Sequence, residues 1–200
     1  MAKLYYQGHG SFRITAADDR VIYVDPFAGD GYDLPADLIL VTHQHRDHNR
    51  TELCAQKPDC RIISNEEALA DGVHQRFSFD GIAIEAVEAY NRMHDPKKSV
   101  GYILTLDGVT LYASGDTSKT AQMETFAARA LDYALFPCDG VFNMKLKEAA
   151  DCARLAAAKH NIPIHLKPGA LFDAKRAVKW DAPNRLIVQP GEEILLEVSP

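Results

Sequence analysis

The sequence predicts an α+β protein in which helices cover β-sheets. Short strands with alternating hydrophobic residues, separated by Gly, Asp and Pro turns, fill the chain up to about residue 114. From about residue 119, strands alternate with helical patterns. Hydrophobic residues make up 46% and charged residues 25% of the 200 residues, so disordered and fibrous classes are excluded.

The N-terminal part contains most of the predicted strands. A short helix is expected to begin at Asn65, with Glu66 and Glu67 in its first turn, and to stop at Gly72. The turn Asp107-Gly108 favours a hairpin between the last two strands of this part. The expected strands are 4–8, 11–15, 21–25, 37–42, 61–64, 74–79, 82–88, 100–106 and 109–114.

The C-terminal part mixes helices and strands. The Ala-rich segment 146–159 has the clearest helical pattern, and further helices are expected at 119–130 and near 171–178. The expected strands are 133–137, 162–166, 185–189 and 193–198. A chain of this length can bury one core, so we expect a single domain, 1–200.

Charge and composition restrict the classes of partner and the cellular compartment that we expect. The net charge of −6 argues against nucleic acid, because phosphate-tracking surfaces need excess Lys and Arg. No apolar run approaches the roughly 18 residues that span a bilayer, and the N-terminus lacks a signal peptide's apolar region. We therefore expect a cytoplasmic protein with a small-molecule substrate and no membrane partner. The sequence does not determine the oligomeric state. Its four cysteines are expected to be reduced and mostly buried.

The segment DLILVTHQHRDHN carries the strongest chemical signal. An apolar strand leads directly into His43, His45, Asp47 and His48, in the pattern H-x-H-x-D-H. Imidazole nitrogens and carboxylate oxygens suit zinc and neighbouring first-row metals. Because side chains alternate in direction, His43 and His45 can face one metal while Asp47 and His48 serve a second. A His-rich surface turn is the alternative interpretation.

This motif resembles that of the metallo-β-lactamase superfamily, and the resemblance extends along most of the chain. VDPF, YNRMH, SGDT and IPIHL occupy the places of further superfamily motifs. The resemblance implies a four-layer αβ/βα sandwich with two divalent metal ions. It implies that His43, His45 and His94 bind one metal, that Asp47, His48 and His165 bind the other, and that Asp116 bridges them.

Some histidines have competing interpretations. His160 ends a predicted helix, where a capping role is ordinary, so His165 at a strand end is the preferred ligand. His94 could instead be a surface residue, and Asp116 a turn residue. His9, flanked by glycines in QGHGSF, is either a residue that contacts the ligands or a structural histidine.

Within the superfamily, the chain is similar to small metal-dependent hydrolases, a group that includes sugar-lactonase-like enzymes. GHGSF and the segment FPCDGVFNM support this likeness. Asp25, in VDPF at the end of a predicted strand, resembles the superfamily's early aspartate. The likeness makes Asp139, Asn143 and Met144 candidates for the pocket lining, with an ordinary turn as the alternative. Cys138-Asp139 departs from the group's usual loop, so the substrate stays open.

The resemblance implies hydrolysis by a hydroxide held between the two metals, acting on an ester, a lactone or a phosphodiester. Asp47 would be a ligand that also orients the nucleophile and accepts its proton. Zinc is the expected metal, and manganese, iron and nickel are also compatible. The alternatives are an iron-dependent oxidoreductase with the same ligands, or a non-catalytic metal-binding protein. His45, where flavodiiron-like oxidoreductases have Glu, argues against the oxidoreductase.

The charge of such a centre favours a small anionic substrate. Two divalent ions, two carboxylates and a hydroxide leave about one positive charge. The lysines expected near the site are Lys145, Lys147, Lys167 and Lys175. Lys167 is the preferred anion contact, because it follows His165 by two residues and shares its direction if the strand continues.

Overall fold

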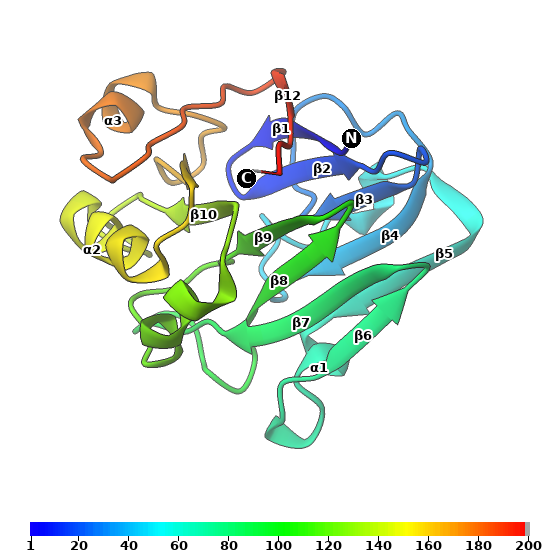
Figure 1. Ribbon diagram of the computed structural model, residues 1–200, viewed down its shortest axis with the longest axis horizontal. Coiled ribbons are helices and arrows are strands. Elements are labelled where there is room, and N and C mark those ends of the chain that lie inside the picture. The colour runs from blue at the N-terminus through cyan, green and yellow to red at the C-terminus, as the bar shows by residue number, and fades with distance from the viewer. Residues whose placement is uncertain (199–200) are drawn as a thin grey trace.

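Two six-stranded mixed sheets form the centre of the computed structural model, which describes residues 1–198 (Figure 1). The first sheet has the order β12-β1-β2-β3-β4-β5, with bounds Glu193–Leu195, Lys3–Gly8, Ser11–Thr15, Val21–Val24, Ala36–Val41 and Gln56–Ser64. The second has the order β11-β10-β9-β8-β7-β6, with bounds His160–Ile164, Tyr133–Pro137, Val109–Ala113, Val100–Leu106, Ile82–Glu88 and Arg76–Phe79.

Strand direction brings eight strand ends to one side of the molecule. In the first sheet β1 to β3 alternate in direction and β4 and β5 run parallel to β3, so β1, β3, β4 and β5 point the same way. In the second sheet β7, β9, β10 and β11 share a direction for the same reason. The loops that follow these strands can therefore build a common site.

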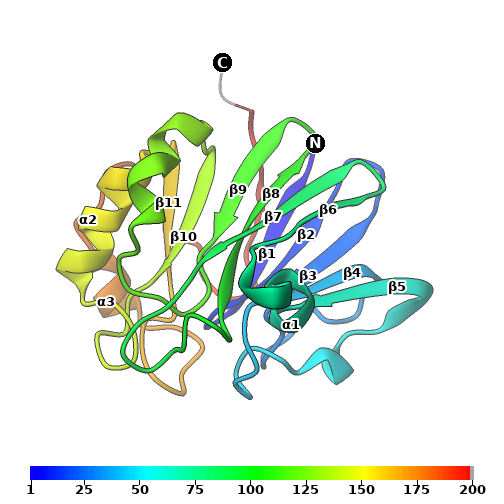
Figure 2. The same ribbon diagram turned by 90° about the horizontal axis from the view of Figure 1, so that it is seen from below.

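The main core lies between the sheets, and a second core lies behind the second sheet. Leu4, Ile84 and Tyr102 are fully or almost fully buried members of the first core. In the second core α2 (Leu146–Ala156), α3 (Ala174–Lys179) and the 3-10 helix η3 (Gln122–Arg129) pack around Trp180. Figure 2 shows α2 and α3 on the outer side of β10 and β11.

The outer layer of the first sheet is thinner. Tyr23 and Tyr32 stack there with their ring centroids 5.6 Å apart, and Cys54 and Ile39 complete a small cluster. A loop and the 3-10 helix η1 (Thr51–Leu53) cover this face. The predicted α+β sandwich is thus confirmed, with a helical layer that is substantial only over the second sheet.

Several predicted elements differ from the observed ones. The predicted helix 119–130 is the shorter 3-10 helix η3, and the predicted helix 146–159 ends at Ala156, because Ala157 has a left-handed φ of 51°. Segment 185–189 makes only one bridge, from Arg185 to Asn161, and is not a strand. Strand β11 ends at Ile164, two residues earlier than predicted.

Other expectations are confirmed. The short helix α1 (Asn65–Ala68) begins where predicted, capped by the Ser64 side chain, and a 3-10 turn η2 ends at Gly72. All four cysteines are free, and Cys60 alone among them is not fully buried. Within residues 1–198, no helix has the length and apolar character needed to cross a membrane.

Candidate metal centre

The predicted ligands lie together in loops that follow four of the co-directional strands, β4, β7, β9 and β11. The H-x-H-x-D-H segment follows β4, His94 lies in the loop after β7, and Asp116 lies three residues after β9. His165 comes directly after β11. Residues 100 and more apart in the sequence therefore meet, and the structure places all seven predicted ligands in overlapping clusters.

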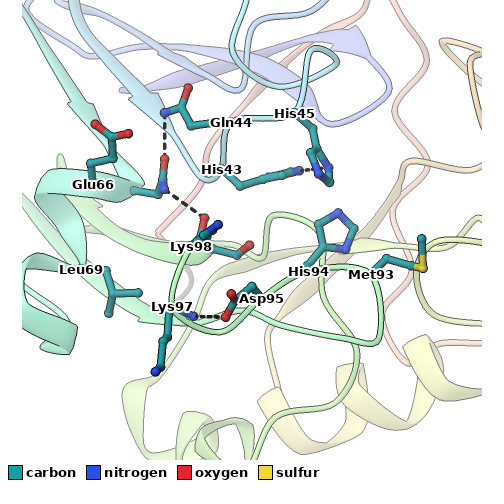
Figure 3. A pocket seen from close by; sticks show the side chains of 12 residues that line it. His43, Gln44, His45, Glu66, Leu69, Met93, His94, Asp95, Lys97 and Lys98 are labelled. Atoms are coloured by element: carbon teal, nitrogen blue, oxygen red, sulfur yellow. Dashed lines mark hydrogen bonds between the residues drawn. The ribbon is translucent and has the colours of Figure 1, made fainter.

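His43, His45 and His94 form the first cluster, in which the three imidazoles face one another (Figure 3). The Nε2 atom of His43 is 3.1 Å from Nδ1 of His45. Thr42 Oγ1 donates to Asp25 and lies 3.0 Å from His43 Nδ1. The single hydroxyl proton is thus used, so His43 Nδ1–H donates to Thr42 and Nε2 keeps its lone pair.

His94 is oriented in the same way by its own loop. Its Nδ1 lies 2.8 Å from Asn91 Oδ1, an acceptor, so Nδ1–H donates and Nε2 is left with a lone pair. That Nε2 atom is 3.3 Å from Asp116 Oδ2. His94 is therefore directed toward the bridging carboxylate by Asn91.

Asp116 joins the first cluster to the second. Its Oδ1 is 3.3 Å from His48 Nε2, and its Oδ2 is 3.4 Å from His165 Nε2. His165 Nε2 also lies 3.8 Å from Asp47 Oδ2. One carboxylate thus faces histidines from both predicted ligand groups.

The donor atoms fit divalent metal ions. A tetrahedral zinc with bonds of about 2.0–2.1 Å separates neighbouring ligand atoms by roughly 3.3 Å, which is close to the contacts above. The Nε2 atoms of His48, His94 and His165 are buried without a hydrogen-bond partner in the described part of the chain. Buried polar atoms are rarely left without a partner, and cations at the two predicted positions would together satisfy all three.

Two further carboxylates hold the ligand histidines from behind. Asp25 Oδ2 is 2.9 Å from His48 Nδ1, while its Oδ1 accepts from the Thr42 backbone N–H at 2.7 Å. Asp139 Oδ2 lies 3.0 Å from His165 Nδ1. A carboxylate on the far nitrogen fixes the tautomer of a ligating histidine and strengthens it as a donor.

His9 contacts the ligands directly. Its Nδ1 lies 3.0 Å from the Ala170 carbonyl oxygen and its Nε2 lies 3.1 Å from Asp47 Oδ2. Its ring centroid is 3.7 Å from that of His165. Of the two interpretations of His9, the geometry favours a role beside the ligands. His160, by contrast, stacks on Tyr133 away from them.

Unusual backbone conformations accompany the site. His9, Asp25 and His165 have left-handed φ values of 59°, 48° and 45°. Such conformations are costly for residues with a side chain and are concentrated at functional sites. A Cβ atom on Gly10 would lie 2.7 Å from His48 Cε1, which explains the glycine after His9.

Electrostatics divides the histidines into two kinds. Burial lowers the pKa of His43 to about 2, so it stays neutral and ready to ligate. Burial also opposes charge on His48 and His165, but nearby carboxylates, Asp116 foremost, outweigh it. They raise the pKa of His165 to about 9 and that of His48 well above its ordinary value. The positive charges of His48 and His165 in turn hold the pKa of Asp116 well below its usual range, against the effect of its burial.

The remaining predicted residues have mixed outcomes. Because β11 ends at Ile164 and His165 has a positive φ, Lys167 does not continue the direction of His165, and it is exposed. Met144 is buried in the second core and does not line the site. Asn143 is buried and bonds to Asp139 at 2.9 Å. Thr42 and Asn91 were not predicted, although each is a hydrogen-bonding residue close before a ligand.

Two cavities meet at the ligands. The larger, about 540 Å³, lies beside His43 and includes Lys97 and Lys98 (Figure 3). The smaller, about 290 Å³, is lined by His45, Asp47, Met93, His94, Asp116, Phe142 and His165, and we name it the ligand cavity. His45, Met93 and His94 belong to both cavities, so a bound molecule can extend from one into the other.

Comparison with known proteins agrees with the fold and the site. A profile of the Beta-lactamase superfamily domain matches residues 3–165. This defines the class as a metallo-β-lactamase fold protein. A UPF0173 metal-dependent hydrolase of Pyrococcus furiosus is 31% identical, over 98% of this chain and 100% of that protein. The chain therefore belongs to the beta-lactamase superfamily and, within it, to the UPF0173 metal-dependent hydrolases.

Solved structures show the same architecture. A candidate metal-dependent hydrolase from Parabacteroides distasonis is 31% identical, covers 92% of this chain and 91% of its own, and superposes with a TM-score of 0.74. Igni18, a metallo hydrolase from Ignicoccus hospitalis, covers 99% of both chains with a TM-score of 0.77. At 22% identity, Igni18 shows the fold alone.

Replacing Asp25 by Asn should weaken metal binding about 10- to 100-fold, because the far nitrogen of His48 loses its anionic partner. Equilibrium competition with a chromophoric chelator measures the affinity. Asp37→Asn is the matched control, since Asp37 accepts the Val21 backbone N–H at 2.8 Å at the opposite end of β4. Equal losses in both variants would contradict a metal-specific role for Asp25.

Proposed function

We propose that this metal-dependent hydrolase uses two divalent ions, zinc foremost, to cleave an ester, lactone or phosphodiester bond of a small substrate. The observation that carries the proposal is the position of Asp116, whose two oxygens face His48 on one side and His94 and His165 on the other. When bound, the ions supply an activated water at neutral pH and stabilise developing negative charge.

Residues of the chain itself orient the attacking water and accept its proton. Asp47 is half-buried, and its Oδ2 faces both His9 at 3.1 Å and His165 at 3.8 Å. This arrangement holds the carboxylate at the edge of the ligand cavity, where it can take a proton from the attacking water. His9 keeps Asp47 in that position and does not need to contact the substrate.

Binding of an anionic end of the substrate requires a lysine near the candidate ligands. Asp25 and Asp139 add two negative charges next to the ligands, so the ions alone exert less attraction than a count of Asp47 and Asp116 suggests. Lys97 and Lys98 line the larger cavity and replace Lys167 as the proposed anion contacts. Glu66 and Asp95 in the same cavity limit how strongly an anion is held.

An activity panel tests the proposed reaction. Esters, lactones and phosphodiesters, each as a neutral and an anionic member, are assayed with the zinc-loaded protein and after chelation. We expect chelator-sensitive hydrolysis, with a lower KM for the anionic member. Redox activity with an iron-loaded, coloured protein and no hydrolysis would favour an oxidoreductase instead. Metal binding without any turnover would favour a non-catalytic protein.

Metal stoichiometry tests the binuclear arrangement. The saturated protein should hold close to two equivalents of zinc by elemental analysis, and His165→Ala should hold close to one, because His165 Nε2 faces Asp116 and Asp47. His160→Ala is the matched control, since His160 begins β11 and stacks on Tyr133. A wild-type value of one that His165→Ala leaves unchanged would exclude the second ion.

A further inference from the structure

Three exposed apolar side chains lie beside the ligand cavity. Met93 is 56% exposed and Phe142 is 44% exposed, and both line the cavity together with five predicted ligands. Val141, next to Phe142, is 66% exposed. Large apolar side chains gathered at a functional cavity mark a contact surface for a ligand. We name Met93, Val141 and Phe142 the apolar rim.

A rigid loop holds Phe142 in its exposed position. One oxygen of Asp139, Oδ1, accepts from the backbone N–H groups of Val141, Phe142 and Asn143, at 2.6, 2.7 and 3.2 Å. Its other oxygen accepts from Asn143 Nδ2 at 2.9 Å and faces His165. The loop therefore cannot rearrange to bury Phe142 without disturbing the support of His165.

A pair of amides ties the two sides of the rim together. Asn91 Nδ2 donates to the Phe142 carbonyl oxygen at 3.0 Å and to Asn143 Oδ1 at 3.1 Å. Asn91 Oδ1 accepts from the Met93 backbone N–H at 2.8 Å and from His94 Nδ1. Asn91, which orients His94, thus also fixes Met93 and Phe142, so the rim has a set position relative to the ligands.

We propose that the apolar rim binds an apolar group of the substrate directly beside the scissile bond. This inference rests on the proposed hydrolase function and adds the chemical class of the group that flanks the bond. A small molecule is the favoured occupant, because the rim and the ligands share one cavity of about 290 Å³. The substrate accordingly combines an apolar aryl or alkyl group at the reacting centre with polar or anionic parts in the larger cavity.

Binding of hydroxamates to the zinc-loaded protein tests this without requiring turnover. Acetohydroxamate and benzohydroxamate carry the same metal-binding group and differ in apolar size. Covering roughly 60 Å² of ring surface favours binding about tenfold, so Phe142→Ala should reduce the benzohydroxamate-to-acetohydroxamate affinity ratio by about that factor. Calorimetry should show unchanged acetohydroxamate affinity, and elemental analysis should show unchanged zinc content.

Two further variants sharpen the comparison. Met93→Ala should reduce the ratio in the same direction, because Met93 lines the same cavity. Val178→Ala is the matched control, since Val178 is 62% exposed on α3 and belongs to neither cavity named above. It should leave the ratio unchanged.

The outcomes separate the two proposals. If zinc binds but both rim variants keep the wild-type ratio, the apolar rim is not a substrate contact, while the hydrolase proposal stands. If neither hydroxamate binds the zinc-loaded protein, the hydrolase proposal itself is overturned. If Phe142→Ala instead converts a dimer into a monomer in sedimentation and keeps the ratio, the rim is an interface between copies of the chain.

Discussion

Asp116→Asn is expected to reduce hydrolytic activity by more than about 100-fold, which is the upper range for losing a residue that only supports a ligand. The variant should also fail to hold two zinc equivalents. The reason is geometric: Asp116 is buried, and its oxygens lie 3.3–3.4 Å from the Nε2 atoms of His48, His94 and His165. An uncharged amide cannot bridge two cations as a carboxylate does.

The matched control is Asp132→Asn. Asp132 is likewise buried, but it accepts the Thr110 backbone N–H at 2.9 Å and lies just before β10, at the end away from the ligands. It should lose some stability and keep its zinc. Elemental analysis and activity measured on both folded variants decide the question. An Asp116→Asn variant with full zinc content and near-normal turnover would remove Asp116 from the bridging role.

The meeting of the candidate ligands was predictable because their motifs lie in loops that follow predicted strands. The apolar run before His43 and the strand before Asp116 predict that each of these residues lies at a sheet edge. Strand order and direction then bring these ends together, as β4 and β9 show from opposite sheets. Sequence motifs carry this information because metal ligation allows few residue types at each position.

The substrate contact, one strand and the pairing between loops were harder to predict. The prediction for Lys167 depended on β11 continuing past Ile164. A local sequence pattern does not reveal where a strand ends in three dimensions. Segment 185–189 has a good strand pattern but finds only one bridge, because β-structure depends on a partner as well as on the residues themselves. The partnership of Asn91 with Asn143, 52 residues apart, has no local signal at all.

The stabilising effect of zinc should grow steadily from about pH 6.5 to about pH 9. In protein stripped of metal by a chelator, the carboxylates around His165, Asp116 foremost, raise its pKa to about 9 despite its burial, and they raise the pKa of His48 too. Zinc must displace these protons, so its affinity should rise about tenfold per pH unit for each proton displaced. With unperturbed histidines, the rise would end near pH 6.5.

The stability of the metal-free protein changes in the opposite direction. A histidine whose pKa is higher in the folded than in the unfolded state stabilises the fold fully below its unfolded pKa of about 6.5. That contribution is lost as the pH rises through the folded value, which is about 9 for His165. The metal-free protein should therefore melt at a lower temperature at pH 9 than at pH 6.5, as the carboxylates lose their cationic partners.

Thermal unfolding of zinc-loaded and chelated protein across pH 6 to 9 measures both effects together. Because zinc binds more tightly while the metal-free fold weakens, the difference in Tm should widen throughout this range. Calorimetric titrations in buffers of different ionisation enthalpy should also show proton release at pH 7. A Tm difference that levels off above about pH 6.5 would mean that His48 and His165 are already neutral there. Asp116 and the neighbouring carboxylates would then not keep these two histidines protonated in the metal-free protein.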